Sequence, residues 1–311
     1  MDILVSTRGI ACFITLNRPQ ALNALTLPMV LAMAAALDAA NRDPAVQQIV
    51  LASSSAKAFC AGGDVRAATQ HKDQPEIGAR FFRAEYELNY AIATSPKSVI
   101  ALVDGICMGG GLGLACHAAY TVASEPSLWA MPELAIGLFP DVGAGYFLNQ
   151  CADGFGEWFT LSGARIEGAQ AVAAGLADVL VTSAQLADVM SRLEREGAAE
   201  ILATFTPAPA PTLPQPRWER EYAPTGSPTS IRLTQQHLTA CKGLSLRAVL
   251  QRDYRLACGC LRGHDFYEGV RALLIDKDKS PRWQPATLAA VTQEQLEKHL
   301  APPFGPELFE S

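Results

Sequence analysis

The stretch CMGGGLGLACH, residues 107–117, places four glycines within positions 109–113. It directly follows the apolar run SVIALVDGI, which predicts a buried strand. Glycines between a strand and a helix let the backbone approach a ligand closely, because N–H groups at a helix start are unpaired. Tight packing of a helix on a sheet would explain the glycines equally well, so this stretch alone leaves both interpretations open.

A second glycine turn occurs earlier in the chain. The stretch KAFCAGGDVRA, residues 57–67, follows the apolar run IVLASSS and again places a glycine pair just before a helical segment. An oxyanion hole for an ester or thioester carbonyl needs two N–H donors, because negative charge develops on that oxygen during the reaction. Two glycine turns behind two strands therefore favour acyl chemistry.

Two carboxylates stand in an otherwise almost wholly apolar segment. In AMPELAIGLFPDVGAGYFL, residues 130–148, these are Glu133 and Asp141. Burying a carboxylate is costly, so such a group is either paired or holds a proton for transfer. The structural alternative is that Glu133 caps the turn after Pro132 and Asp141 is the N-cap of the next helix.

Other catalytic motifs have little support. No GxSxG stretch is present, which argues against a serine hydrolase elbow. The predicted strand, the glycine turn and the acid at position 133 are arranged as in a dinucleotide-binding site. The motif is incomplete, however, because Cys116 stands where its third glycine or alanine should be. A nucleotide-dependent oxidoreductase is therefore a less favoured alternative.

Composition restricts the partners. The 311 residues carry a net charge of −6, so we expect no nucleic-acid surface, and we expect neither a membrane span nor a secretory signal. The eight cysteines are scattered and lie mostly in apolar runs, which predicts reduced thiols, no metal site and a cytoplasmic location.

Hydrophobic periodicity predicts an α/β fold. Residues 2–19 predict a hairpin; the helices expected next span 26–43 and 81–95, and strands span 47–53 and 98–105. Helices dominate after Asp141, including one long helix over 184–205. Seven prolines between 207 and 228 predict an extended linker. We therefore predict a core domain over 1–205, a Pro-rich linker over 206–228 and a C-terminal helical region over 229–311.

With these segments in view, the sequence resembles the crotonase (enoyl-CoA hydratase/isomerase) superfamily, and more closely its 3-hydroxyisobutyryl-CoA hydrolase branch. The superfamily features are LNRPQALNAL (16–25), AFCAGGD (58–64) and DGICMGGGLGLA (104–115). The branch features are WAMPELAIGLFPDVGAGYFL (129–148) and the segment 254–285, from YRLACGC to WQP. The resemblance implies a spiral of ββα units with a helical C-terminal region.

The resemblance also implies roles for particular residues. The N–H groups of Gly63 and Gly110 would form the oxyanion hole. Family hydratases use two glutamates; the second corresponds to Glu133, whereas the first falls on Gly113. The hydrolase branch also has glycine there, and its second acid corresponds to Asp141. An incomplete acid/base pair argues against hydration of a double bond and favours hydrolysis of a thioester.

The expected function is thus hydrolysis of a short branched or 3-hydroxy acyl-CoA. A hydratase or isomerase acting through Glu133 alone and a non-catalytic acyl-CoA binder are the alternatives. Coenzyme A belongs to the substrate, so we expect no separate cofactor, and a homo-oligomer stays open. The residues expected to contact the acyl-CoA flank the glycine turns: Lys57, Ala58, Cys60, Asp64, Arg66 and Gly109. Arg271, Lys277 and Lys279 are further candidates for its phosphates.

Overall fold

The computed structural model describes residues 1–70, 72–152, 154–205 and 224–310. The chain divides into two compact units, each assembled from three separate stretches. Unit 1 comprises Met1–Gly63, Leu88–Trp129 and Arg165–Gln215, and unit 2 comprises Asp64–Glu87, Ala130–Ala164 and Pro216–Ser311. The two units are described separately below.

A six-stranded sheet forms the centre of unit 1, in the order β1-β2-β3-β5-β7-β10. Its strands are β1 (Ile3–Arg8), β2 (Ala11–Leu16), β3 (Gln48–Ser53), β5 (Ser98–Val103), β7 (Tyr120–Ser124) and β10 (Val179–Val181). Strands β1 and β2 form the predicted antiparallel hairpin, and the other neighbours are parallel. The parallel strands are almost fully buried, which explains their continuous apolar sequences.

A second sheet has four strands in the order β4-β6-β8-β9. They are β4 (Ala58–Cys60), β6 (Ile106–Met108), β8 (Leu128–Ala130) and β9 (Ile166–Glu167). The chain adds one strand to the large sheet and the next to the small sheet, as in β3 then β4, and β5 then β6. This alternation is the expected spiral of ββα units, and the predicted α/β class is confirmed.

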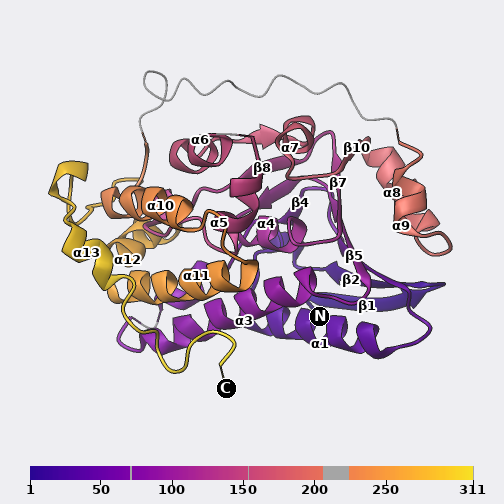
Figure 1. The fold of residues 1–311 in the computed structure, drawn as a ribbon, viewed down its shortest axis with the longest axis horizontal. Helices are drawn as coiled ribbons and strands as arrows, with labels where there is room; N and C mark the ends of the chain where they lie inside the picture. The colour runs from indigo at the N-terminus through magenta and orange to yellow at the C-terminus, as the bar shows by residue number, and fades with distance from the viewer. Residues whose placement is uncertain (71, 153, 206–223, 311) are drawn as a thin grey trace. The chain divides into compact units, whose positions relative to one another are not determined.

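Helices cover the sheet of unit 1. The first, α1 (Leu27–Arg42), begins where predicted because the Thr26 side chain accepts a hydrogen bond from the Met29 N–H. The shorter α4 (Gly110–Ala115) begins after Gly109, and α7 (Gly168–Ala174) begins at a capping box formed by Glu167 and Gln170. Figure 1 shows α8 (Ser183–Arg192) and α9 (Ala198–Leu202) beside β10, where their apolar residues join the core of the sheet.

The long helix predicted over 184–205 is two helices, α8 and α9. Between them, the buried Gln48 amide donates to the carbonyls of Leu193 and Glu196 and accepts from the Ala198 N–H. A side chain distant in sequence thus satisfies the backbone groups that the break exposes. Periodicity in the helical segment could not reveal this partner.

Unit 2 is mainly helical. It contains α2 (Val65–Thr69) and the part of α3 (Pro75–Ala93) that ends at Glu87. The segment after β8 forms η2 (Glu133–Ile136), α5 (Ala144–Phe147), η3 (Leu148–Gln150) and α6 (Phe155–Ser162). The C-terminal helices are α10 (Pro228–Ala240), α11 (Leu246–Arg262), α12 (Asp265–Val270) and α13 (Gln293–Lys298), with single turns at Arg271–Ile275 and Leu288–Ala290.

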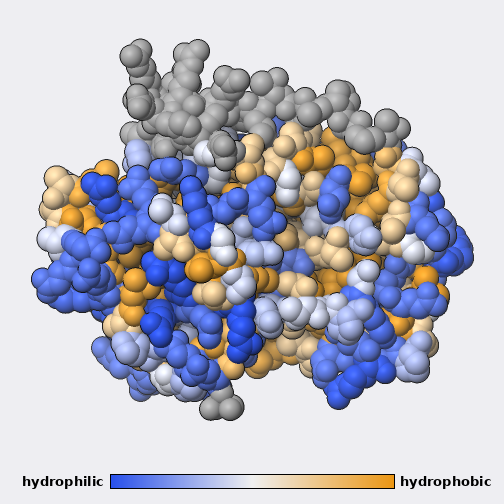
Figure 2. All heavy atoms as spheres, in the orientation of Figure 1, coloured by the Kyte–Doolittle hydropathy of each residue, from blue (hydrophilic) through white to orange (hydrophobic). Residues whose placement is uncertain are grey.

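The predicted helical C-terminal region is confirmed. Over the face of unit 2 where Figure 1 labels α10, α11 and α13, hydrophilic and hydrophobic residues are interspersed (Figure 2). The predicted linker falls largely on 206–223, which lie outside the described residues. The boundaries at 205/206 and 228/229 therefore stay predictions.

Candidate functional site

The glycines of CMGGGLGLACH form the tight entry to α4 in unit 1. Gly109 is the N-cap residue and has a φ of +50°, a conformation that L-residues with side chains rarely adopt. At Gly111 a Cβ atom would lie 2.4 Å from the Cys60 carbonyl oxygen, so only glycine fits against β4. Close packing therefore accounts for Gly111, and the positive φ accounts for Gly109.

The two glycine turns lie side by side within unit 1. A Cβ atom added to Gly62 would lie 3.6 Å from the Gly110 nitrogen. The Leu25 N–H donates to the Gly62 carbonyl at 2.8 Å, and this bond does not involve the Gly63 N–H. Among the described residues, the backbone bonds of turns and loops include none that the Gly63 N–H donates. That the Gly63 and Gly110 N–H groups form an oxyanion hole stays a prediction.

The residues expected to contact acyl-CoA fall in both units. In unit 1, Lys57 is exposed next to β4, whereas Ala58 and Cys60 are buried within it. The Gly62 N–H donates to the Cys60 sulfur at 3.4 Å, so this thiol packs in the turn. In unit 2, Asp64 is the N-cap residue of α2 and the Arg66 side chain is exposed.

Arg271 is held within its own segment of unit 2. Its guanidinium pairs with the carboxylates of Glu268, Asp276 and Asp278 at 2.6–2.8 Å. Three acidic partners offset its single charge, which leaves little attraction for a phosphate. Lys277 and Lys279 adopt positive φ angles of 58° and 55°.

The two predicted carboxylates are both buried in unit 2. Glu133 begins η2 and is 5% exposed, and Asp141 is 4% exposed. The Tyr86 hydroxyl donates to Asp141 Oδ2 at 2.5 Å. Gly143, not Asp141, is the N-cap residue of α5, and neither carboxylate makes a capping bond. The capping alternative is therefore wrong for both side chains.

A third buried carboxylate, Glu85, was missed from the sequence. It lies on α3, is 2% exposed, and interacts electrostatically with Glu133 and Asp141. In the described part of the chain, Glu85 Oε1 and Glu133 Oε2 have no hydrogen-bond partner. The sequence did contain a signal for its burial. Phe81 and Phe82 precede Glu85 by four and three positions, and residues at these spacings share one face of a helix, so Glu85 belongs to an apolar face.

Burial raises the pKa of all three carboxyl groups. For Glu133 the next cause is repulsion from Asp141, and for Glu85 it is repulsion from Asp141 and then Glu133. The pKa of Asp141 rises to about 7, because burial and the charge of Asp253 outweigh the Tyr86 hydrogen bond, which lowers it. Carboxyl groups that hold protons near neutral pH can act as acids or bases in catalysis.

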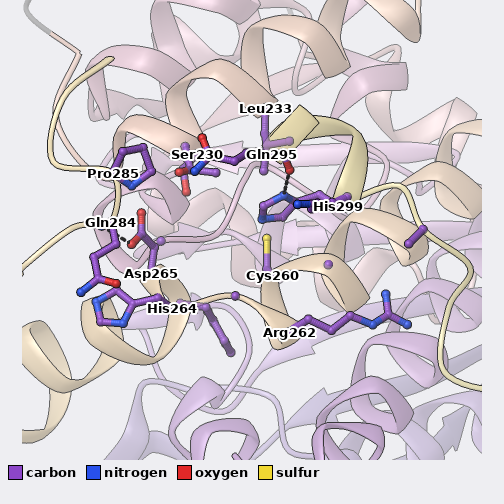
Figure 3. Close-up of a pocket in the computed structure, with 17 residues that line it drawn as sticks. Ser230, Leu233, Cys260, Arg262, His264, Asp265, Gln284, Pro285, Gln295 and His299 are labelled. Carbon is purple, nitrogen blue, oxygen red and sulfur yellow. Dashed lines mark hydrogen bonds between the residues drawn. The ribbon is translucent and has the colours of Figure 1, made fainter. Parts of the chain in front are cut away.

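A separate cavity of about 460 Å³ lies among the C-terminal helices of unit 2 (Figure 3). Figure 3 shows the Asp265 carboxylate accepting a hydrogen bond from the Gln284 N–H and the His299 ring contacting the Gln295 carbonyl. Gly137, which ends η2, also lines it. None of the predicted site residues lines this cavity.

Among the described residues, no three His, Cys, Asp or Glu side chains are grouped to hold a metal ion. No helix in the same part of the chain is long and apolar enough to cross a membrane.

Strands that alternate between two sheets, together with paired glycine turns, define a crotonase-type acyl-CoA protein. The chain belongs to the enoyl-CoA hydratase/isomerase family, whose model matches residues 11–223 and 217–300. Among curated proteins it is similar to the mitochondrial 3-hydroxyisobutyryl-CoA hydrolases of Xenopus laevis and Homo sapiens. Both are 38% identical to it; the matches cover 94% and 96% of this chain and 87% and 88% of the relatives.

Solved structures of the same fold carry other names. A carnitinyl-CoA dehydratase from Mycobacterium thermoresistibile superposes with a TM-score of 0.91 at 33% identity, covering 99% of this chain and 98% of that one. An enoyl-CoA hydratase from Rhodobacter sphaeroides 2.4.1 superposes with a TM-score of 0.86 at 36% identity, covering 99% of both chains.

The predicted cytoplasmic location is wrong on this comparison, because the curated relatives are mitochondrial enzymes. All eight cysteines are free. Free thiols fit more than one cellular compartment, so the cysteine pattern could not support the narrower prediction.

Proposed function

We propose that this protein hydrolyses the thioester of a short branched or 3-hydroxy acyl-CoA, of the 3-hydroxyisobutyryl-CoA type, to the free acid and coenzyme A. The observation that carries the proposal is the pair of positions Gly113 and Glu133. The family hydratases have two glutamates there, and this chain has one. The names of the curated relatives support the same reaction.

In the proposed reaction, the thioester carbonyl oxygen accepts hydrogen bonds from the Gly63 and Gly110 N–H groups. Water attacks the carbonyl carbon and gives its proton to Glu133, while negative charge develops on the oxygen. The tetrahedral intermediate then expels the coenzyme A sulfur, which takes the proton that Glu133 removed from water, so the Glu133 carboxylate is restored, and Asp141 assists this proton transfer. Asp141 also orients the substrate's 3-hydroxyl group.

A covalent route uses the same residues. Glu133 would attack the carbonyl carbon itself, the C–S bond would break and coenzyme A would leave as the thiol, and water would then hydrolyse the resulting anhydride. Both routes yield one acid and one thiol for each water consumed. Neither needs a metal or a separate cofactor, since coenzyme A is part of the substrate.

A hydratase or isomerase that acts through Glu133 alone is the second candidate. It is favoured by the similar solved structures of an enoyl-CoA hydratase and a carnitinyl-CoA dehydratase. Addition of water across a double bond places a proton on one carbon and a hydroxyl on its neighbour, which calls for both an acid and a base. With Gly113 in place of the first glutamate, Asp141 or Glu85 would have to supply the missing group.

One steady-state experiment separates the candidates. The protein is mixed with 3-hydroxyisobutyryl-CoA or with an unsaturated enoyl-CoA of matched length, and free thiol and enoyl absorbance are followed together. Release of thiol from the 3-hydroxy ester supports hydrolysis. Loss of enoyl absorbance without thiol release would overturn it, and binding of both esters without either change would indicate a non-catalytic binder.

A further inference from the structure

The backbone directly after Asp141 adopts an unusual conformation. Val142 has a φ of +52° and Gly143 a φ of +80°, so two consecutive residues are left-handed. A β-branched residue such as valine rarely adopts a positive φ, because its side chain crowds the backbone. A conformation of this kind persists only when surrounding contacts hold it, and it often marks a functional position.

A carboxylate from α11 holds this turn. Asp253 Oδ2 accepts a hydrogen bond from the Gly143 N–H at 2.7 Å, and both partners are fully buried. The Ala144 N–H donates back to the Asp141 carbonyl at 2.9 Å, which closes the turn. A charged acceptor for a buried N–H makes a stronger bond than a neutral one. Asp253 is therefore the side chain that fixes the backbone conformation directly after Asp141.

The other oxygen of Asp253 contacts a buried histidine on α10. His237 Nε2 lies 2.8 Å from Asp253 Oδ1, and the two side chains are 1% and 0% exposed. Among the described residues that oxygen accepts no well-aligned hydrogen bond, and the His237 ring is the polar group that contacts it. The contact restrains the carboxylate that holds Gly143.

His237 also touches the residues on either side of the turn. Its ring meets the Phe139 ring edge-to-face with centroids 5.4 Å apart, two residues before Asp141. Gly145 lets α10 approach, because a Cβ atom there would lie 3.0 Å from His237 Nε2 and 2.7 Å from the Cys241 sulfur. His237 thus contacts the segment 139–145 at Phe139 and Gly145, and Asp253 binds it at Gly143.

We propose that Asp253 is a positioning residue for Asp141: its carboxylate, held by His237, fixes the left-handed turn that presents the Asp141 side chain. This inference rests on the proposed acid/base role of Asp141. Asp253 does not touch substrate in this account, because it lies beneath the turn and has no exposed surface.

The charge of Asp253 adds a second effect. It raises the pKa of Asp141, after burial and against the Tyr86 hydrogen bond. Ionisable groups face Asp141 from several elements: Glu85 and Tyr86 on α3, Glu133 on η2, and Asp253 and Cys260 on α11. Of these, Asp253 also holds the turn after Asp141 by accepting the Gly143 N–H. A substitution that keeps this hydrogen bond therefore changes the charge without changing the position of the turn.

The test compares two substitutions at one position. Asp253→Asn keeps an oxygen to accept the Gly143 N–H but removes the charge, whereas Asp253→Ala removes both. For Asp253→Asn we expect kcat within about threefold of wild type and the pH profile of kcat displaced to lower pH by about half a unit or more. For Asp253→Ala we expect kcat to fall about 10- to 100-fold with KM within about threefold. The loss expected for Asp253→Ala is smaller than the roughly 10²–10⁴-fold contribution of an acid or base itself, because Asp253 acts only by positioning Asp141.

Leu250→Ala is the matched control, since it removes buried volume from the same helix without touching the turn. It should lower the thermal midpoint and leave kcat and the pH profile unchanged below that midpoint. Should Asp253→Ala fail to fold, Asp253→Asn and His237→Gln still report on the pH profile and on kcat.

The proposal is overturned if Asp253→Asn leaves the pH profile unmoved, or if Asp253→Ala loses no more kcat than Leu250→Ala. The wild-type assay keeps this result apart from the proposed function. If the wild type hydrates enoyl-CoA instead of releasing thiol, the proposed function fails, and the Asp253 variants are compared on that reaction.

Discussion

At the scale of single residues, the central feature is a group of carboxylates that share a buried environment. Glu133 and Asp141 could be predicted because each stands alone in an apolar segment. Tyr86, Glu85 and Asp253 could not be predicted as their neighbours, because they come from α3 and α11 and only the fold brings them near. Local sequence context therefore revealed the acids but not the groups that set their protonation.

Glu133→Gln should abolish thiol release, because the amide can neither accept a proton from water nor attack the thioester. We expect kcat to fall at least about 100-fold, the lower end of a general-base contribution. Binding of the acyl-CoA, measured by calorimetry, should persist. The control is Glu125→Gln, an exposed glutamate in the turn between β7 and β8. Thiol release by Glu133→Gln near the wild-type rate would contradict the assignment.

Asp141→Asn should alter how stability depends on pH. In the native state the pKa of Asp141 is about 7, whereas an ordinary aspartate, as in the unfolded state, has a pKa of 3.8. Between these two pH values the native state holds a proton that the unfolded state has lost. Wild-type stability should therefore fall as pH rises from about 4 to 7 through this group. An amide cannot ionise, so the variant avoids that loss.

The expected gain of Asp141→Asn over wild type is on the order of a few kcal/mol at pH 8 and near zero at pH 4. Urea unfolding at the two pH values measures it, with the exposed Asp73→Asn as control. A variant that gains no stability relative to wild type between pH 4 and pH 8 would contradict the raised pKa.

At the scale of helices and strands, segments with a clear hydrophobic pattern could be predicted, whereas the very short strands β4, β6 and β10 could not. The opening hairpin, α1, β3 and β5 lie where the sequence predicts them. The three-residue strands β4, β6 and β10 carry too few residues for a periodic signal. The break between α8 and α9 depends on Gln48, which is distant in sequence.

Gln48→Met should destabilise unit 1 without changing catalysis. The substitution keeps the side-chain length but leaves two carbonyls and one N–H without their partner. We expect a loss of about 2–4 kcal/mol in the free energy of unfolding. Chemical unfolding measures the loss, and Gln47→Met at the exposed neighbouring position is the control. Equal stabilities of the two variants would show that Gln48 does not hold the break.

At the scale of the whole molecule, the order of segments in the chain differs from their grouping in space. Each unit draws on three stretches that are separate in the sequence. Within unit 2, Gly137 packs on the Asp265 carbonyl and Gly78 on the Leu261 side chain. The C-terminal helices thus find their partners in earlier parts of the chain.

A fragment comprising residues 229–311 should therefore not fold cooperatively by itself. Its buried faces lose the partners that 64–87 and 130–164 provide in unit 2. Circular dichroism should show reduced helicity and no sharp thermal transition, in contrast to the full chain. A fragment with native helicity and a cooperative transition would contradict this expectation.

The fold and the family are compatible with two reactions, since the curated relatives are hydrolases and a similar solved structure is that of an enoyl-CoA hydratase. The glycine at position 113 is the residue that separates them in this account. The most direct test is the rate of free thiol release from 3-hydroxyisobutyryl-CoA by the wild-type protein. We predict steady multiple-turnover release that Glu133→Gln abolishes. No thiol release from this ester, with hydration of an enoyl-CoA by the same preparation, would contradict the account.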